Sequence, residues 1–168
     1  MDPTPSDALD LLGAELTPDE RGRLQARMRT TTFPAQAVLC REGESRAGLC
    51  VVERGELAVE VGGAELSRVG PGAWVGEVAL LDPGPASATV RAAVDTTVLE
   101  LDAAALDRLI QDDPRVGRAL VRALSGTLAR RLRQAARHDG AQDLDPTDEA
   151  PRTARSWLQR LFGGPRRS

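Results

Sequence analysis

The spacing of hydrophobic positions changes twice along this chain of 168 residues. From about residue 33 to residue 101, apolar residues alternate with polar ones in short runs, as Leu57, Val59 and Val61 do. A repeat of two is typical of strands that bury one face. On both sides of this region the apolar residues fall three or four positions apart, which is typical of amphipathic helices. The pattern therefore predicts a β-rich centre flanked by helices.

The central region has the pattern of many short strands joined by tight turns. Val90, Ala92 and Val94 repeat the alternation, and glycines recur every several residues. The pair Gly62-Gly63 between two such runs predicts a hairpin. Short strands with regular glycine turns are typical of a small β-roll or barrel.

Two short helices are predicted before the strands, over residues 7–13 and 17–29. Thr17 and Glu20 have the spacing of a capping box, and Pro18 suits the first helical turn. The second helix is therefore expected to begin directly after Thr17.

Two further helices are predicted after the strands, over residues 102–111 and 115–137. Asp102 is the expected N-cap of the first, and Pro114 separates the two. The longer helix carries an apolar stripe that needs a cover, either the chain's own roll or a second copy of the chain. The stripe is thus also a candidate dimer surface; it consists of Leu120, Leu124, Leu128 and Leu132. The fold class is α+β: an antiparallel β-roll or jelly roll with flanking N-terminal helices and a long C-terminal helix.

One domain is expected, over residues 7–137. Residues 138–151 are polar and acidic, which is typical of a disordered linker. Residues 152–168 form a basic amphipathic tail with five arginines and no acid. Such a tail can dock in a groove of a protein partner, contact an anionic membrane surface, pack on its own domain, or stay disordered. Its candidate docking residues are Trp157, Leu158, Leu161 and Phe162.

The net charge is −3, and all 22 basic residues are arginines. Residues 115–137 hold seven of them and no acid, which fits nucleic acid, anionic lipid, an acidic partner or a solvated helix face. No run is long enough to span a bilayer, and the N-terminus lacks the parts of a signal peptide, so we expect a cytoplasmic protein. Cys40 and Cys50 lie in strand-like runs and are expected to be small buried thiols rather than a regulatory disulfide. With His138 as the single histidine and no triad spacing, we expect neither a metal site nor an enzyme.

The segment over residues 76–90, GEVALLDPGPASATV, is more specific than these patterns. It resembles the phosphate-binding cassette of the cyclic nucleotide-binding domain family. Further phrases that resemble the same family stand in order before it, at residues 33–35, 49–57 and 69–77. The resemblance covers about residues 9–137, and it implies a Crp-like effector domain without a helix-turn-helix domain.

The resemblance implies cyclic AMP or cyclic GMP as ligands and gives roles to the cassette residues. The glutamate matching Glu77 accepts the ribose 2′-hydroxyl, and the residues matching Ser87 and Ala88 supply hydroxyl or backbone donors to the cyclic phosphate. From the residues themselves, Gly76 permits close backbone approach, and the helical turn after it offers free N–H groups. The candidate ligand-binding residues are Gly76, Glu77, Val78, Ala79, Ala86, Ser87, Ala88 and Thr89.

The chain departs from this family at Ala86, where the family usually has the arginine that contacts the phosphate. A buried charge pair that loses one partner loses about 2–5 kcal/mol of binding. Arg46 is a candidate replacement in a nearby loop, whereas Arg91 is expected to lie too far along its strand. Three interpretations of the remaining cassette residues stay open: turn formation and packing alone, a functional pocket, and a pocket reshaped for a different or uncharged ligand. Trp74 beside them is expected to pack in the core rather than stack on a base.

These observations lead to two hypotheses of function. The first is a cyclic nucleotide-binding-like regulatory module with weak or no cyclic nucleotide binding. The alternative is a protein-interaction or scaffold protein that uses the roll as a platform and its tail to dock a partner or a membrane surface. About thirty residues follow the long helix, too few for a helix-turn-helix domain, so no sequence-specific DNA binding is expected.

Overall fold

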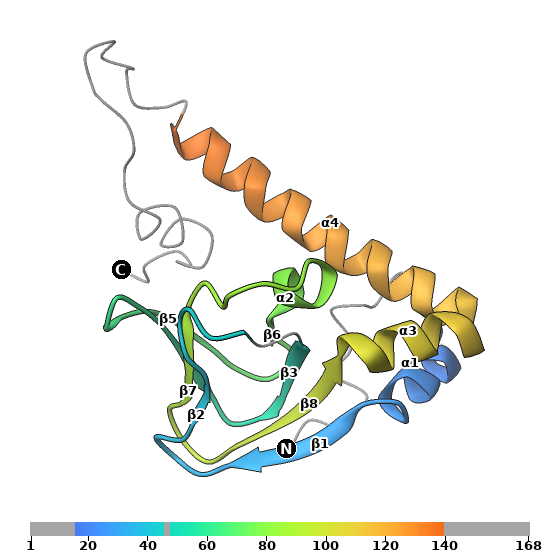
Figure 1. Cartoon of the computed structure of the whole chain (residues 1–168), viewed down its shortest axis with the longest axis horizontal. Coiled ribbons are helices and arrows are strands. Elements are labelled where there is room, and N and C mark those ends of the chain that lie inside the picture. Colours follow the sequence, from blue (N-terminus) through green and yellow to red (C-terminus); the bar gives the residue numbers. More distant parts are fainter. Residues whose placement is uncertain (1–15, 46–47, 140–168) are drawn as a thin grey trace.

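The computed structural model describes residues 16–45 and 48–139. In this part of the chain eight strands form two antiparallel sheets, and a long helix, α4, crosses the molecule above α2 (Figure 1). The predicted helix over residues 7–13 lies outside the described residues. None of the described helices is both long and apolar enough to cross a membrane.

The strands are β1 (Arg29–Phe33), β2 (Val38–Cys40), β3 (Gly48–Arg54), β4 (Leu57–Val61), β5 (Ala64–Val69), β6 (Trp74–Val75), β7 (Thr89–Ala92) and β8 (Thr96–Asp102). The helices are α1 (Pro18–Gln25), α2 (Glu77–Leu81), α3 (Ala103–Asp112) and α4 (Pro114–Asp139).

The two four-stranded sheets have the orders β1-β8-β3-β6 and β2-β7-β4-β5. Every neighbouring pair is antiparallel, and β8 pairs with both β1 and β3 over most of its length. The inner faces of the two sheets share one apolar cluster, which we call the roll interior. The predicted antiparallel roll with flanking helices is therefore confirmed.

The alternating runs form strands, with one correction. Leu57, Val59 and Val61 are all buried in β4, and the hairpin to β5 turns at Gly62 and Gly63, both with positive φ. The predicted extension of the next run to Val94 is wrong. The strand β7 ends at Ala92, and Val94 is 45% exposed because the chain turns there towards β8.

The first described helix begins as predicted and ends earlier. The Glu20 backbone N–H donates to the Thr17 hydroxyl, and the Thr17 backbone N–H donates to the Glu20 carboxylate, so the capping box is present. The prediction that this helix runs to residue 29 is wrong, since α1 ends at Gln25. The β-branched threonines at residues 30–32 pair in register with β8, and that tertiary pairing starts β1 at Arg29.

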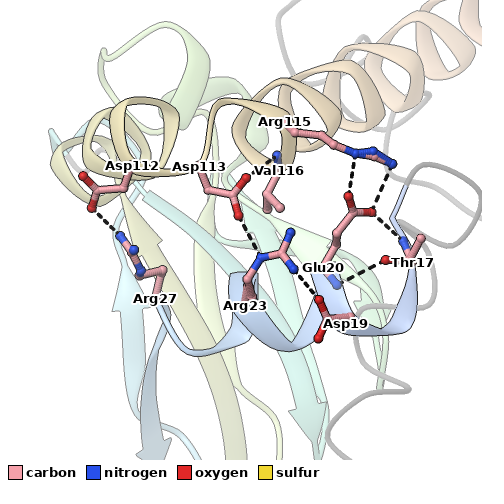
Figure 2. Close-up of polar contacts among 9 residues, drawn as sticks. All are labelled: Thr17, Asp19, Glu20, Arg23, Arg27, Asp112, Asp113, Arg115 and Val116. Carbon is pink, nitrogen blue, oxygen red and sulfur yellow. Dashed lines mark hydrogen bonds and ion pairs between the residues drawn. The ribbon is translucent and has the colours of Figure 1, made fainter.

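Ion pairs join α1 to the junction of α3 and α4 (Figure 2). Arg23 contacts Asp113 at 2.8 Å, and Arg27 contacts Asp112 at 2.7 Å. We call these two contacts, together with a 2.7 Å contact between Arg115 and Glu20, the α1 ion-pair cluster. Because it spans about ninety residues of sequence, the cluster fixes where the first helix sits against the last two.

The two C-terminal helices also begin close to the predicted positions. The Asp102 carboxylate accepts a hydrogen bond from the Ala105 backbone N–H at 2.7 Å, which confirms it as the N-cap of α3. The chain breaks at Asp113, and Pro114 starts α4. Gly117 lies so close to Ile110 that a larger residue there would collide with α3. The break therefore folds α4 tightly back against α3.

A second apolar cluster, the helix-side core, lies between the first sheet and the helices. Leu120 and Leu124 are fully buried in it, and so is nearly all of Trp74, whose core packing was predicted. The stripe on α4 then leaves the core, because Leu128 is half-buried and Leu132 is 47% exposed. The chain's own core thus covers the first half of the stripe, and only the second half remains for another surface.

Candidate functional site

A cavity of about 110 Å³ opens beside the predicted cassette. Seven of the eight predicted ligand-binding residues line it, and the eighth, Thr89, does not. The Thr89 hydroxyl instead accepts a hydrogen bond from the Glu42 backbone N–H at 3.0 Å. The cavity thus joins most of the sequence-predicted site residues in one continuous surface, formed by α2, the turn after it and residues of five strands.

The helix α2 begins at Gly76, whose φ of 86° lies in the left-handed region. A Cβ atom at this position would also overlap the carbonyl oxygen of Gly48 at the start of β3. Both constraints come from the protein's own backbone. The fold itself therefore requires glycine here, whether or not a ligand approaches it.

Glu77 is buried, with 1% of its surface exposed, and it forms an ion pair with Arg131 of α4. Burial raises the pKa of the Glu77 carboxyl, and the Arg131 guanidinium acts in the opposite direction. An acidic group buried this deeply is stable only with such a partner. The glutamate that the resemblance assigns to a ribose hydroxyl is thus already held by a cation of the chain.

Arg131 does not line the cavity itself, but it holds the lining residue Glu77, and the sequence interpretation missed it. Its signal is its position: it lies three residues after Leu128 and seven after Leu124, so it continues the buried face of α4. Its side chain is 22% exposed, which fits a residue on that inward face. A charged residue on the apolar side of a helix predicts a buried partner of opposite charge, and Glu77 is that partner.

Ala86 is held in place by the loop before β3. Its backbone N–H donates to the Glu44 carbonyl at 2.9 Å, and its carbonyl accepts from the Gly43 N–H at 2.8 Å. An isolated β-bridge joins Ser45 and Pro85 next to them. The backbone of the cassette is therefore ordered by the protein without any arginine side chain at position 86.

The described lining of the cavity has a hydroxyl group exposed to solvent but no positively charged side chain. Ser87 is exposed, and its hydroxyl makes no hydrogen bond with any described residue. No arginine of the described chain lines the cavity. Arg91 is occupied elsewhere, as predicted, since it contacts Glu60 at 3.1 Å and the Gln36 carbonyl at 3.1 Å. The other candidate, Arg46, lies outside the described residues.

The deep wall of the cavity belongs to the roll interior. It includes Leu39, Val59 and Val90 of one sheet and Val75 of the other. Cys40 and Cys50 also line it, and they form no disulfide with each other. Cys50 is buried as predicted, whereas Cys40 is only half-buried. The cavity thus joins a polar mouth at the cassette to an apolar interior between the sheets.

The sequence also led to predictions about the tail, the linker and metal binding, which do not concern this cavity. The tail residues Trp157, Leu158, Leu161 and Phe162 lie beyond the described part of the chain, as does the predicted linker. Within the described part, no group of three or more histidine, cysteine or acidic side chains is arranged to hold a metal ion.

Comparison with known proteins matches the same region. Residues 30–113 match the model of the cyclic nucleotide-binding domain. A cyclic nucleotide-gated potassium channel from Mesorhizobium japonicum is 38% identical over 53% of this chain and 24% of its own length. The CRP-like cAMP-activated global transcriptional regulator of Mycobacterium tuberculosis is 30% identical over 84% of this chain and 63% of its own. The chain thus spans less than two thirds of the length of these curated relatives.

A solved structure agrees with the sequence comparison. The N-terminal domain of a transcriptional regulator from Streptomyces coelicolor A3(2) superposes with a TM-score of 0.66 at 31% identity. The match covers 86% of this chain and 100% of that one. The family match begins in β1 and ends at the α3–α4 junction, so it includes both sheets and the whole cavity. With the roll, the cassette and the family model all falling on the same residues, the chain belongs to the cyclic nucleotide-binding domain family.

Proposed function

We propose that the chain is a regulatory module of the cyclic nucleotide-binding type whose own cassette binds cyclic nucleotides weakly or not at all. The observation that carries this proposal is the absence of any arginine from the described lining of the cavity, with Ala86 at the position where the family usually has one. The charged residues that do line it are Glu77 and Asp82, both acidic. Because Glu77 is already paired with Arg131 and Asp82 adds negative charge, an anion entering this cavity meets no available cation in the described lining.

The size of the expected loss follows from the charge pair. Removing one partner of a buried, hydrogen-bonded pair weakens binding by about 2–5 kcal/mol, or about thirty- to several-thousand-fold. The short helix α2 and the Ser87 hydroxyl still offer donors to a phosphate, but a helix terminus contributes only about 0.3–2 kcal/mol. These donors are too weak to replace a guanidinium.

Calorimetric titration with cyclic AMP and cyclic GMP tests this proposal. The native chain should show dissociation constants near the millimolar range, and Ala86→Arg should bind at least thirtyfold more tightly, to about the micromolar range. Ala104→Arg is the matched control, because it adds the same charge on an exposed position of α3 far from the cavity. Micromolar binding by the native chain would contradict the proposal. If Ala86→Arg binds no more tightly than Ala104→Arg, the cassette has lost more than its cation.

We also propose that the exposed half of the α4 stripe pairs two copies of the chain. Leu132 is 47% exposed and Leu128 half-buried, and an apolar edge on a projecting helix is stabilised when a second helix covers it. Sedimentation velocity should show a dimer that Leu132→Glu converts to a monomer. Arg133→Gln, which changes the net charge equally at the next exposed position, should leave the dimer intact. A monomeric native chain at all accessible concentrations would rule out this pairing.

A further inference from the structure

The cassette cavity extends into a part of the roll interior that the chain's own side chains leave unfilled. Its deep wall combines branched aliphatic side chains of both sheets with two thiols: Leu39, Cys40, Cys50, Val59, Val75 and Val90. Protein interiors are otherwise packed with few voids larger than a water molecule. A space of about 110 Å³ against such a wall is favourable for apolar atoms, because filling it removes apolar surface from water.

The described residues at the mouth of the cavity provide no unpaired positive charge for an anionic ligand. Glu77 is neutralised by Arg131, and Asp82 is the other charged residue in the described lining. An anion held there would lose its hydration and gain no opposite charge from the described lining. Among the uncharged side chains of the described lining, the exposed Ser87 hydroxyl is the polar group that remains available, whereas the Ala86 backbone groups are bound to Gly43 and Glu44.

We infer that this cavity binds a small uncharged molecule. This inference rests on the proposed function, in which anionic cyclic nucleotides bind weakly or not at all. The molecule has a compact apolar part, about the size of one ring, and one hydroxyl or amide group. The ring lies against the wall formed by Leu39, Val59 and Val90, and the polar group reaches Ser87. The volume sets this upper limit, because an apolar cavity of about 150 Å³ holds benzene, and this cavity, at about 110 Å³, is smaller and open at its mouth, so it has room for one ring at most.

Phenol and benzoate form a matched pair of probes, because they share the ring and differ in charge at neutral pH. Titrations of the full chain, followed by NMR of the leucine and valine methyl groups, should show saturable shifts at Leu39, Val59 and Val90 with phenol, at a dissociation constant of about 1 mM or lower. Benzoate should give no saturable shift at these methyl groups. An absence of phenol shifts, or equal binding of benzoate, would overturn the inference.

Two variants locate the site. Ser87→Ala removes one hydrogen bond at an exposed position and should weaken phenol about fivefold while leaving benzene unchanged. Ala88→Leu places extra carbon atoms in the cavity from a buried lining residue and should abolish phenol binding, provided that circular dichroism shows the native fold. If Ala88→Leu does not fold, the Ser87→Ala and benzoate comparisons still decide the matter. An unchanged phenol affinity in Ser87→Ala would place the probe elsewhere.

The same titrations separate this inference from the proposed function. If the native chain binds neither cyclic AMP nor phenol, the degenerate cassette stands and the uncharged ligand falls. If it binds cyclic AMP at micromolar concentration, the proposed function falls, whatever phenol does.

Discussion

Position 76 is fixed by two independent constraints on a single residue. The backbone is in the left-handed region, and the Gly48 carbonyl lies where a Cβ atom would stand. A motif can identify this glycine, but it cannot tell which contact requires it. The sequence suggested room for a ligand, whereas the structure shows that β3 occupies the space.

Gly63 offers a control that separates the two constraints, because it has a φ of 78° and no atom within contact distance of an added Cβ. Gly63→Ala should therefore lower the free energy of unfolding by about 1–2 kcal/mol, from backbone strain alone. Gly76→Ala carries the same strain plus a backbone clash, and should lose about 1–3 kcal/mol more. Urea unfolding of both variants measures the difference. Equal losses would show that β3 gives way to the added atom.

The residues of the cassette illustrate what a sequence can and cannot predict at this scale. Gly76, Glu77 and Ala86 were all found from the motif, because the family's roles depend on local spacing. Arg131 was not, since its partner lies 54 positions earlier in the chain. The pairing depends on how α4 crosses α2, and that crossing is a property of the folded roll.

At the scale of elements, α4 is fixed at two places along its length. Its first turns are buried in the helix-side core, and further along Arg131 holds it to α2 through Glu77. The periodicity of the helix predicted its stripe, but not the point at which the stripe leaves the core. That point depends on the size of the roll beneath it, which no local pattern encodes.

Arg131→Met should loosen this second attachment. The variant leaves Glu77 buried without a counter-charge, which costs about 3–5 kcal/mol of unfolding free energy. Burial raises the pKa of Glu77, so the carboxyl can take up a proton at low pH; the loss in stability should therefore be smaller at pH 5 and grow as the pH rises to 8. Urea midpoints at the two pH values measure this dependence.

Two further variants control this experiment. Arg130→Met removes a neighbouring exposed arginine and should change stability little. Glu77→Gln combined with Arg131→Met removes the buried charge and should recover most of the loss. A single variant Arg131→Met as stable as the native chain would show that the ion pair does not hold α4.

At the scale of the whole molecule, the α1 ion-pair cluster joins the two ends of the described domain. Hydrogen bonding from Arg23 holds the pKa of the Asp113 carboxyl below its usual range, and the Thr17 backbone N–H does the same for the pKa of Glu20. Sequence patterns predicted the helices on each side of the roll. They could not predict that three arginines would match three acids across the chain, because such pairing exists only after the sheets have closed.

The lowered pKa values predict acid sensitivity. A carboxyl whose pKa is lower in the folded state stabilises the fold above its unfolded pKa, and this contribution is lost as the pH falls. The melting temperature should therefore drop below about pH 4.5, and Asp113→Asn should be less stable at neutral pH with a shallower drop. Asp107→Asn is the control, since Asp107 is exposed on α3 and makes no ion pair with any described residue. Parallel acid profiles for native and Asp113→Asn chains would argue against the cluster as their cause.

The tight fold at Asp113 and Pro114 has a mechanical consequence. A helix the length of α4 measures about 39 Å, so a tilt of about 10° at its base carries the far end through about 7 Å. The attachment of Arg131 to Glu77 opposes such a tilt, because it holds α4 to α2 well beyond the base of the helix. The direction in which the far end of α4 projects therefore depends on the packing of α2 beneath it.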